Sequence, residues 1–201
     1  MFGEPSRESK YKKIKFSNCS HNLTKGPFGS DMKKSLYVQK SATTYKVYLQ
    51  INAIQKDITL GDYYISEEYF KQKMFKYEVK PGDFIITCDG TLGEFIQVNE
   101  PMEKGVISSS LMRVTLDEDK IYKRFFEFLW KYYMLPVMER QTRNSCLLHL
   151  PSAKALGDIE IPLPPMPIQR VFSDFSEQTD KSKYVVGNAL NANFVGGECY
   201  A

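Results

Sequence analysis

Apolar residues occur along this chain mostly in short runs bounded by turn residues, a spacing typical of strands. The apolar run at 84–86 lies between a Pro-Gly turn signal at 81–82 and an Asp-Gly turn signal at 89–90. Another apolar pair follows at 95–96, after a stretch rich in glycine and threonine. The pattern predicts a buried strand, a tight turn with a small polar tip and a returning strand. The next strand is expected to run through Leu111 to Leu116.

Two segments have helical periodicity instead. Ser66 can cap a helix that continues to about Tyr77, because its first turn carries two acidic residues that favour a helix N-terminus. A second helix is expected to start near Asp119 and to continue past Tyr133, with aromatic residues recurring on one face. We interpret this aromatic face as hydrophobic core rather than as a surface on which bases stack. Alternating strands and helices predict an α/β (mixed α+β) fold with one mixed, twisted sheet and flanking helices.

The C-terminal part has a different pattern. A polar–apolar alternation at 158–161 predicts a strand, and four prolines between 162 and 167 then favour an extended connection. Helical spacing resumes afterwards, in a short heptad-like series that begins with Ile168, Phe172 and Phe175. We therefore expect a single globular domain over residues 1–163. Residues 164–201 are expected to form a proline spacer, a C-terminal coiled-coil-like helix and a frayed tail.

Composition narrows the class of protein. A chain of 201 residues with 42% hydrophobic residues is long enough for one packed domain. Its longest apolar run falls well short of the roughly 20 residues that a membrane span needs, and its N-terminus lacks the apolar segment of a secretory signal. The four cysteines are far apart in the sequence, which favours structural thiols over a metal site and indicates a cytoplasmic location.

The charge is unevenly distributed, although the formal net charge is only +3. Residues 1–34 contain eight Lys or Arg against three acidic residues, and residues 120–143 contain six against two. Two basic segments on an otherwise acidic chain can focus a positive field on one side of the molecule. They can equally be two solvated surfaces that happen to be rich in lysine.

Four motifs in a fixed order resemble the specificity subunit of type I restriction–modification systems. The strongest are the Pro-Gly-Asp strand with its Gly-Thr-x-Gly tip at 81–93 and the series His-Leu, Ile-Pro-Leu-Pro-Pro and Gln at 149–169. The segment at 1–5 is similar to the start of a target-recognition domain, and Gly26 to Ser30 is similar to the early glycine-rich loop of these subunits. Gly105 to Val114 also resembles the strand that follows the Gly-Thr tip in this family.

The resemblance implies a target-recognition domain that recognises double-stranded DNA for a modification subunit, which methylates adenine, and for a restriction subunit. It implies no cofactor, metal or catalytic residue in the chain itself. Two features depart from the family: Ile168 replaces an acidic residue, and the chain has room for one recognition domain instead of two. We therefore interpret it as a half-length subunit, a truncated gene product or an excised domain.

A protein that recognises a DNA sequence needs cations for phosphates and hydrogen-bonding groups for base edges. Three segments supply these groups: the glycine-rich loop, the hairpin tip and a basic stretch before the His-Leu motif. The candidate DNA-binding residues are Lys25, Gly29, Ser30, Lys33, Lys34, Thr87, Gly90, Thr91, Arg140, Gln141, Arg143, Asn144 and Ser145. Each segment also has a purely structural interpretation, as a surface turn, a hairpin or a solvated helix end.

Several alternatives remain open at the level of sequence. The apolar positions Ile168, Phe172 and Phe175 can pack on a partner helix, including that of a second copy, or on the chain's own domain. A DNA-modifying enzyme with an unrecognised site is one rival function, although the chain lacks an Asp/Asn-Pro-Pro-aromatic motif and a glycine-rich nucleotide loop. A protein-interaction module, or a truncated remnant that does not bind DNA, is the other.

Overall fold

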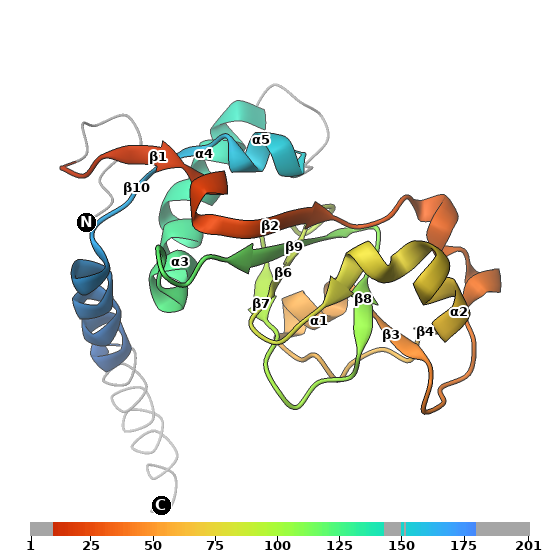
Figure 1. Ribbon diagram of the computed structural model, residues 1–201. Helices are drawn as coiled ribbons and strands as arrows, with labels where there is room; N and C mark the ends of the chain where they lie inside the picture. Colours follow the sequence, from red (N-terminus) through yellow and green to blue (C-terminus); the bar gives the residue numbers. More distant parts are fainter. Residues whose placement is uncertain (1–9, 143–149, 151, 180–201) are drawn as a thin grey trace, which may run out of the picture.

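The computed structural model of the chain describes residues 10–142, 150 and 152–179. In this part of the chain, two four-stranded sheets, a two-stranded ribbon and several short helices form a mixed α/β body (Figure 1). A further helix, over residues 166–179, begins at this body and extends away from it (Figure 1). The predicted fold class is therefore confirmed, with the strands divided between sheets instead of joined in one.

The first sheet is antiparallel throughout and has the strand order β2-β9-β6-β7. Its strands are β2 (Ser20–Lys25), β9 (Leu111–Leu116), β6 (Phe84–Thr87) and β7 (Phe95–Gln97). The predicted strand-turn-strand unit is confirmed, since β6 pairs with β7 across the Gly-Thr tip. Strand β6 is buried on both faces, because Phe84 and Ile86 point into one hydrophobic core and Ile85 into another.

The second sheet is mixed, with the order β4-β3-β8-β5 and one parallel pair, β3 with β8. Its strands are β3 (Tyr45–Tyr48), β4 (Tyr64–Ile65), β5 (Glu78–Val79) and β8 (Gly105–Ile107). The strand predicted through Leu111 to Leu116 is confirmed as β9, whereas the single strand from Gly105 to Val114 that the resemblance implied is wrong. A turn at Ser108–Ser110, closed by a 3.2 Å hydrogen bond from the Leu111 N–H to the Ser108 carbonyl, carries the chain from the second sheet to the first.

Helices connect and cover these sheets. They are the 3-10 helices η1 (Phe16–Cys19), η2 (Gly29–Met32), η3 (Lys34–Leu36) and η5 (Phe75–Tyr77), the π-helices η4 (Phe70–Met74) and η6 (Trp130–Met134), the α-helices α1 (Gln50–Gln55), α2 (Glu67–Tyr69), α3 (Lys123–Leu129), α4 (Leu135–Thr142) and α5 (Ala153–Gly157), and an α-helix over residues 166–179. The Ser66 hydroxyl accepts a 3.1 Å hydrogen bond from the Tyr69 N–H, so the predicted helix cap is confirmed. None of the helices in the described ranges combines the length and hydrophobicity that a membrane span requires.

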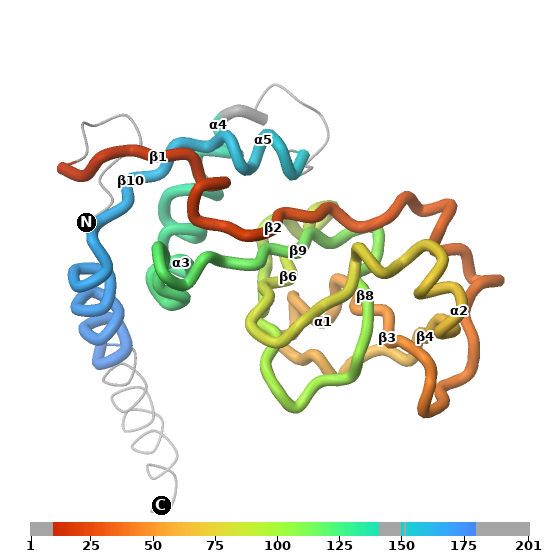
Figure 2. The backbone as a smooth tube through the Cα atoms, in the orientation of Figure 1, coloured from red at the N-terminus to blue at the C-terminus, as the bar shows by residue number. Residues whose placement is uncertain are grey.

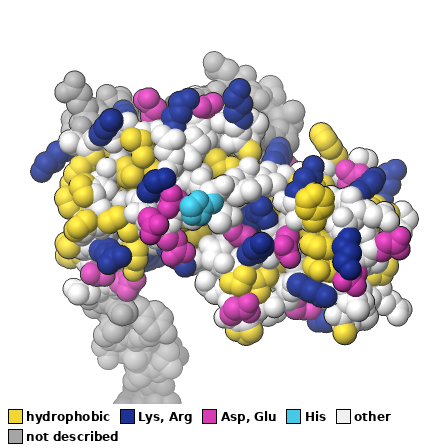
Figure 3. All heavy atoms as spheres, viewed as in Figure 1, with side chains coloured by type: hydrophobic (Ala, Val, Ile, Leu, Met, Phe, Trp, Pro, Cys, Tyr) yellow, Lys and Arg dark blue, Asp and Glu magenta, His cyan; other side chains and the backbone are white. Residues whose placement is uncertain are grey.

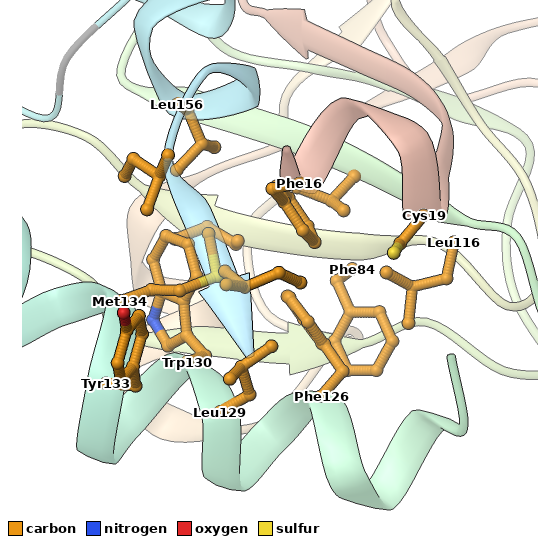
Figure 4. Close-up of a cluster of buried hydrophobic side chains, with 14 of the residues drawn as sticks. Phe16, Cys19, Phe84, Leu116, Phe126, Leu129, Trp130, Tyr133, Met134 and Leu156 are labelled. Carbon is orange, nitrogen blue, oxygen red and sulfur yellow. The ribbon is translucent and has the colours of Figure 1, made fainter. Parts of the chain in front are cut away.

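The larger core confirms the interpretation of the aromatic helix face. Helices α3 and η6 pack on the first sheet and direct Phe126, Leu129 and Trp130 toward Phe16 and Phe84 (Figure 4). The rings of Phe16 and Phe126 stack with their centroids 5.6 Å apart. Full burial of such large side chains contributes roughly 2–3 kcal/mol each to stability, which makes this core the main support of the fold.

A second core lies on the other face of the first sheet. It joins Ile85 and Leu111 of that sheet to Val47 and Val106 of the second sheet and to Met74 of η4. The two sheets are thereby held together by apolar side chains. This core therefore fixes the strand ends of the first sheet relative to the second sheet.

The first and last described strands pair with each other. Strand β1 (Lys13–Lys15) is antiparallel to β10 (Glu160–Pro162), so segments far apart in the sequence lie side by side (Figure 2). The helix at 166–179 begins soon after β10. Gln169 of this helix is fully buried, and its amide hydrogen-bonds the backbone of Lys120, Tyr122 and Pro164.

Candidate nucleic-acid interface

Two of the three candidate segments leave the first sheet at the same edge. Strand β9 runs antiparallel to both β2 and β6, with Lys25 opposite Met112 and Thr87 opposite Leu111. The end of β2, the end of β6 and the start of β9 therefore coincide. The loop after β2 and the tip after β6 flank the Ser108–Ser110 turn that precedes β9.

Backbone hydrogen bonds hold these segments together at that edge. The Gly26 N–H donates to the Leu111 carbonyl (2.8 Å), and the Cys88 N–H donates to the Ser110 carbonyl (2.8 Å). The Leu150 N–H donates to the Cys88 carbonyl (2.9 Å), so the chain that follows α4 also returns to this edge. We call the edge formed by residues 25–34, 87–93 and 108–110 the loop edge of the first sheet.

The loop after β2 presents the groups that the sequence predicts. Lys25, Gly29, Ser30, Lys33 and Lys34 are all exposed. Although these residues are exposed, two tyrosine hydroxyls hydrogen-bond the backbone of the loop. Tyr69 donates to the Asp31 carbonyl (2.9 Å) and Tyr37 donates to the Met32 carbonyl (3.1 Å). Three lysine cations and one hydroxyl thus stand on an ordered backbone, an arrangement suited to a polyanion.

The hairpin tip divides into a buried base and an exposed end. Thr87 is fully buried; its hydroxyl accepts from the Glu94 N–H (3.0 Å) and donates to the Thr91 carbonyl. Thr87 therefore builds the tip, and its hydroxyl is buried away from the surface that a partner would meet. Gly90 and Thr91 are exposed, and Gly90 has a φ of 73°, which a residue with a side chain rarely adopts.

The third segment is only partly within the described residues. Arg140 lies near the end of α4 and is exposed. Gln141 belongs to the same helix. Arg143, Asn144 and Ser145 lie outside the described residues, so their predicted role stays a prediction.

The three positions predicted to pack on a partner helix have different environments. Phe172 packs on its own domain, with its ring edge-to-face against Phe125 (6.0 Å) and Phe128 (5.2 Å). Ile168 and Phe175 are 37% and 68% exposed, and Val171 beside them is 69% exposed. Phe172 therefore packs on its own domain, whereas packing of Ile168 and Phe175 on a partner helix stays a prediction.

Two buried thiols and one buried lysine lie within the described part of the chain. Burial raises the pKa of the Cys19 thiol to about 11 and that of the Cys88 thiol to about 12, which keeps both thiols protonated and unreactive. Buried Lys46 donates to the Thr59 carbonyl (2.7 Å). No group of three potential metal-ligating side chains occurs within the described ranges.

Sequence reasoning missed three features of the loop edge. The Ser108–Ser110 turn lies between the two candidate loops, but the resemblance to the family implied one strand through these residues. Gln50 of α1 donates to the Asp89 carbonyl (2.7 Å) and so steadies the hairpin tip, a contact across 39 residues with no local signal. Phe28 is 82% exposed within the basic loop.

Lys and Arg side chains on the face seen in Figure 3 are interspersed with acidic ones. The loop after β2 departs locally from that mixture, because residues 25–34 contain three lysines and one aspartate. The excess of positive charge at the loop edge therefore comes from the lysines of this loop.

Similarity to known proteins is found at the level of the family and of the fold. Residues 27–191 match the family model described as the type I restriction modification DNA specificity domain. No curated protein matches the chain at a significant level.

Among solved structures, the chain resembles one from a study of complex assembly and conformational transition in the type I R-M system, with a TM-score of 0.67 and 15% identity. It also resembles the HsdS subunit from Thermoanaerobacter tengcongensis (TM-score 0.65, 16% identity) and the type I restriction–modification S subunit from M. genitalium (TM-score 0.51, 15% identity). These matches cover 96%, 94% and 93% of this chain but 44%, 42% and 43% of those chains. The chain thus spans less than half the length of the structures whose fold it shares.

Proposed function

Because the chain belongs to the family of type I restriction–modification DNA specificity domains, we propose that it recognises a double-stranded DNA sequence for partner subunits. The feature that best supports this function is the convergence of candidate segments at the loop edge. Exposed cations and hydrogen-bonding groups on braced loops meet the two requirements of sequence recognition, contact with phosphates and contact with base edges.

The residues divide by chemistry. Lys25, Lys33 and Lys34 neutralise phosphates, which contributes to affinity for any sequence. Ser30 and Thr91 can hydrogen-bond base edges or phosphates. The candidates with the strongest preference for particular bases are Arg140, Gln141, Arg143 and Asn144, since arginine pairs with guanine and amide side chains pair with adenine. Ser145 and the backbone of Gly29 and Gly90 complete the proposed contact surface.

The proposed partners are the modification and restriction subunits of a type I system in the cytoplasm. The chain itself contributes recognition, and bond making and breaking belong to those partners. One recognition domain recognises one part of a two-part target, so a second domain is needed for the whole. We propose that a second copy supplies it, through pairing of the helices at 166–179 along their exposed apolar positions, which makes the target an inverted repeat.

The test is DNA binding measured as a function of salt, with the full chain alone and together with its modification subunit. Affinity should fall steeply as salt rises, and Lys33→Ala should lower the slope of log K against log salt by about 0.9 for every sequence. Lys80→Ala is the matched control, because exposed Lys80 precedes β6 and so lies at the opposite edge of the same sheet. Binding that is insensitive to salt and to Lys33 would contradict the proposed function.

A second variant tests base recognition. Arg143→Ala should change which sequence is preferred in a selection from randomised duplexes, whereas Lys33→Ala should leave the preference unchanged. Equal loss of affinity for all sequences in both variants would remove Arg143 from the base-contacting residues.

A further inference from the structure

Phe28 is the most exposed of the large hydrophobic side chains in the described residues, at 82%. It lies in the loop after β2, between Lys25 and Lys33. A single exposed hydrophobic residue is common on protein surfaces and by itself indicates nothing. The way in which the loop holds Phe28 outward is what distinguishes this position.

The backbone on the N-terminal side of Phe28 already lies in close contact with the turn before β9. Gly26 is so close to the turn before β9 that a Cβ atom there would lie 1.9 Å from the Ser108 carbonyl oxygen. Pro27 follows and is buried. The backbone therefore packs directly against the first sheet immediately before Phe28, and the fixed φ of Pro27 restricts its conformation further.

The backbone on the C-terminal side is held as well. The Phe28 carbonyl accepts a 2.9 Å hydrogen bond from the Asp31 N–H, which closes the start of η2. Met32 at the end of η2 is buried. The position from which the ring projects is thus set by folding, so that little backbone entropy remains to be lost when the ring meets a partner.

The loop that carries the ring is rich in cations. Lys25, Lys33 and Lys34 are exposed on the same loop, and Asp31, its one acidic residue, lies 3.8 Å from Lys73. A hydrophobic protein partner would be expected to meet a larger apolar patch, but the other apolar side chains of this loop, Pro27 and Met32, are buried. An isolated aromatic ring on a loop with three exposed lysines fits a nucleic acid, whose bases offer apolar faces and methyl groups inside a shell of phosphates.

We propose that Phe28 contacts a nucleobase directly and is a specificity-determining residue of this domain. The inference rests on the proposed DNA recognition and adds an apolar base contact to its polar ones. The surrounding lysines bind phosphates, which are the same in every sequence. Phe28 contributes discrimination, through the 5-methyl group of a thymine or the face of a base partly displaced from the stack.

The experiment begins by selecting the preferred duplex from a randomised pool, with the full chain bound to its modification subunit. Affinities for that duplex and for an unrelated one are then measured for the unmodified chain, for Phe28→Ala and for Phe28→Leu. Phe28→Ala should weaken binding to the preferred duplex about tenfold more than binding to the unrelated duplex. Phe28→Leu should recover part of the loss, and the salt dependence should stay the same, because no phosphate contact changes.

Phe75→Ala is the matched control, since Phe75 is 61% exposed but lies on η5. It should leave both affinities unchanged. Fluorescence of Trp130, the one tryptophan of the chain, verifies that each variant is folded.

Two modified duplexes identify the part of the base that is contacted. If Phe28 touches a thymine methyl group, replacing that thymine by uracil weakens binding of the unmodified chain but causes no further loss in Phe28→Ala. If it contacts a displaced base, 2-aminopurine at that step becomes more fluorescent with the unmodified chain and not with Phe28→Ala. Either result supports the proposal.

If Phe28→Ala loses the same affinity for both duplexes, or loses none, the proposed role of Phe28 is overturned. DNA recognition itself still stands in that case, provided that binding by the unmodified chain is selective for the preferred duplex and depends on salt. An unmodified chain that binds no DNA even with its modification subunit would overturn both.

Discussion

At Gly26 the backbone of the loop after β2 approaches the β8–β9 turn more closely than a side chain would permit. Gly26→Ala should therefore force the loop away from the first sheet and lower the free energy of unfolding by about 1–3 kcal/mol, as overpacking generally does. Urea unfolding followed by Trp130 fluorescence measures this change. Gly29→Ala is the control in the same loop, because nothing lies within 4 Å of a Cβ atom at Gly29. Equal stability of the two variants would contradict the close approach.

A second prediction at the residue scale concerns Glu103. Its carboxylate lies 2.6 Å from the Lys40 ammonium and 3.5 Å from that of buried Lys46. Burial raises the pKa of Glu103, but hydrogen bonds and attraction from the two lysines outweigh burial and hold the pKa below its ordinary value of 4.5. The ionised form is thus favoured by folding, so its contribution to stability is complete above pH 4.5 and is lost as the pH falls through the lowered pKa.

Glu103→Gln should accordingly lower stability at neutral pH and flatten the decline of stability in acid. Denaturant unfolding at a series of pH values measures both effects. Glu118→Gln serves as the comparison, because Glu118 forms its 3.0 Å ion pair with Lys123 at a more exposed position. An unchanged pH profile in Glu103→Gln would show that these lysines do not stabilise the carboxylate.

At the scale of elements, one side chain attaches the C-terminal helix to the domain. The Gln169 amide nitrogen donates to the Lys120 (2.9 Å) and Pro164 (2.8 Å) carbonyls, and its oxygen accepts from the Tyr122 N–H (2.9 Å) at the start of α3. Gln169→Leu preserves the approximate volume but leaves three backbone groups without this partner. Each buried unsatisfied group costs about 1–3 kcal/mol, so this variant should be strongly destabilised.

Hydrogen exchange can locate that effect. The Tyr122 amide and the amides at 166–179 should exchange faster in Gln169→Leu, whereas Arg170→Leu, at an exposed position of the same helix, should leave them protected. Similar exchange in both variants would mean that the helix is held by the packing of Phe172 on Phe125 and Phe128 alone.

At the scale of the whole molecule, the proposed self-pairing depends on the exposed side of the same helix. Ile168, Val171 and Phe175 form an apolar strip together with Pro167 and Phe172. If two copies pair along this strip, Phe175→Glu should raise the dissociation constant of the dimer at least about tenfold, because a charge would be buried at the contact. Sedimentation equilibrium measures the change, with Phe75→Glu as the control for an exposed phenylalanine elsewhere. A chain that stays monomeric at every concentration, also with its modification subunit present, would contradict self-pairing.

The sequence by itself determined the local elements and their order. The strand-turn-strand unit, the Ser66 cap and the aromatic core helix could all be predicted, because periodicity, turn residues and capping groups act within a few residues of one another. The ordered motifs indicated the family for the same reason, since each is a short local pattern.

Only the tertiary structure decided which of these pieces form a site. Pairing of β9 with both β2 and β6 brings the candidate loops to one edge, buries Thr87 and leaves Phe28 outside, and none of these outcomes has a local signal. The division of Gly105 to Val114 between two sheets and the burial of Gln169 are of the same kind. Strand partners and side-chain exposure depend on contacts between residues far apart in the chain, and those contacts are formed only when the two cores assemble.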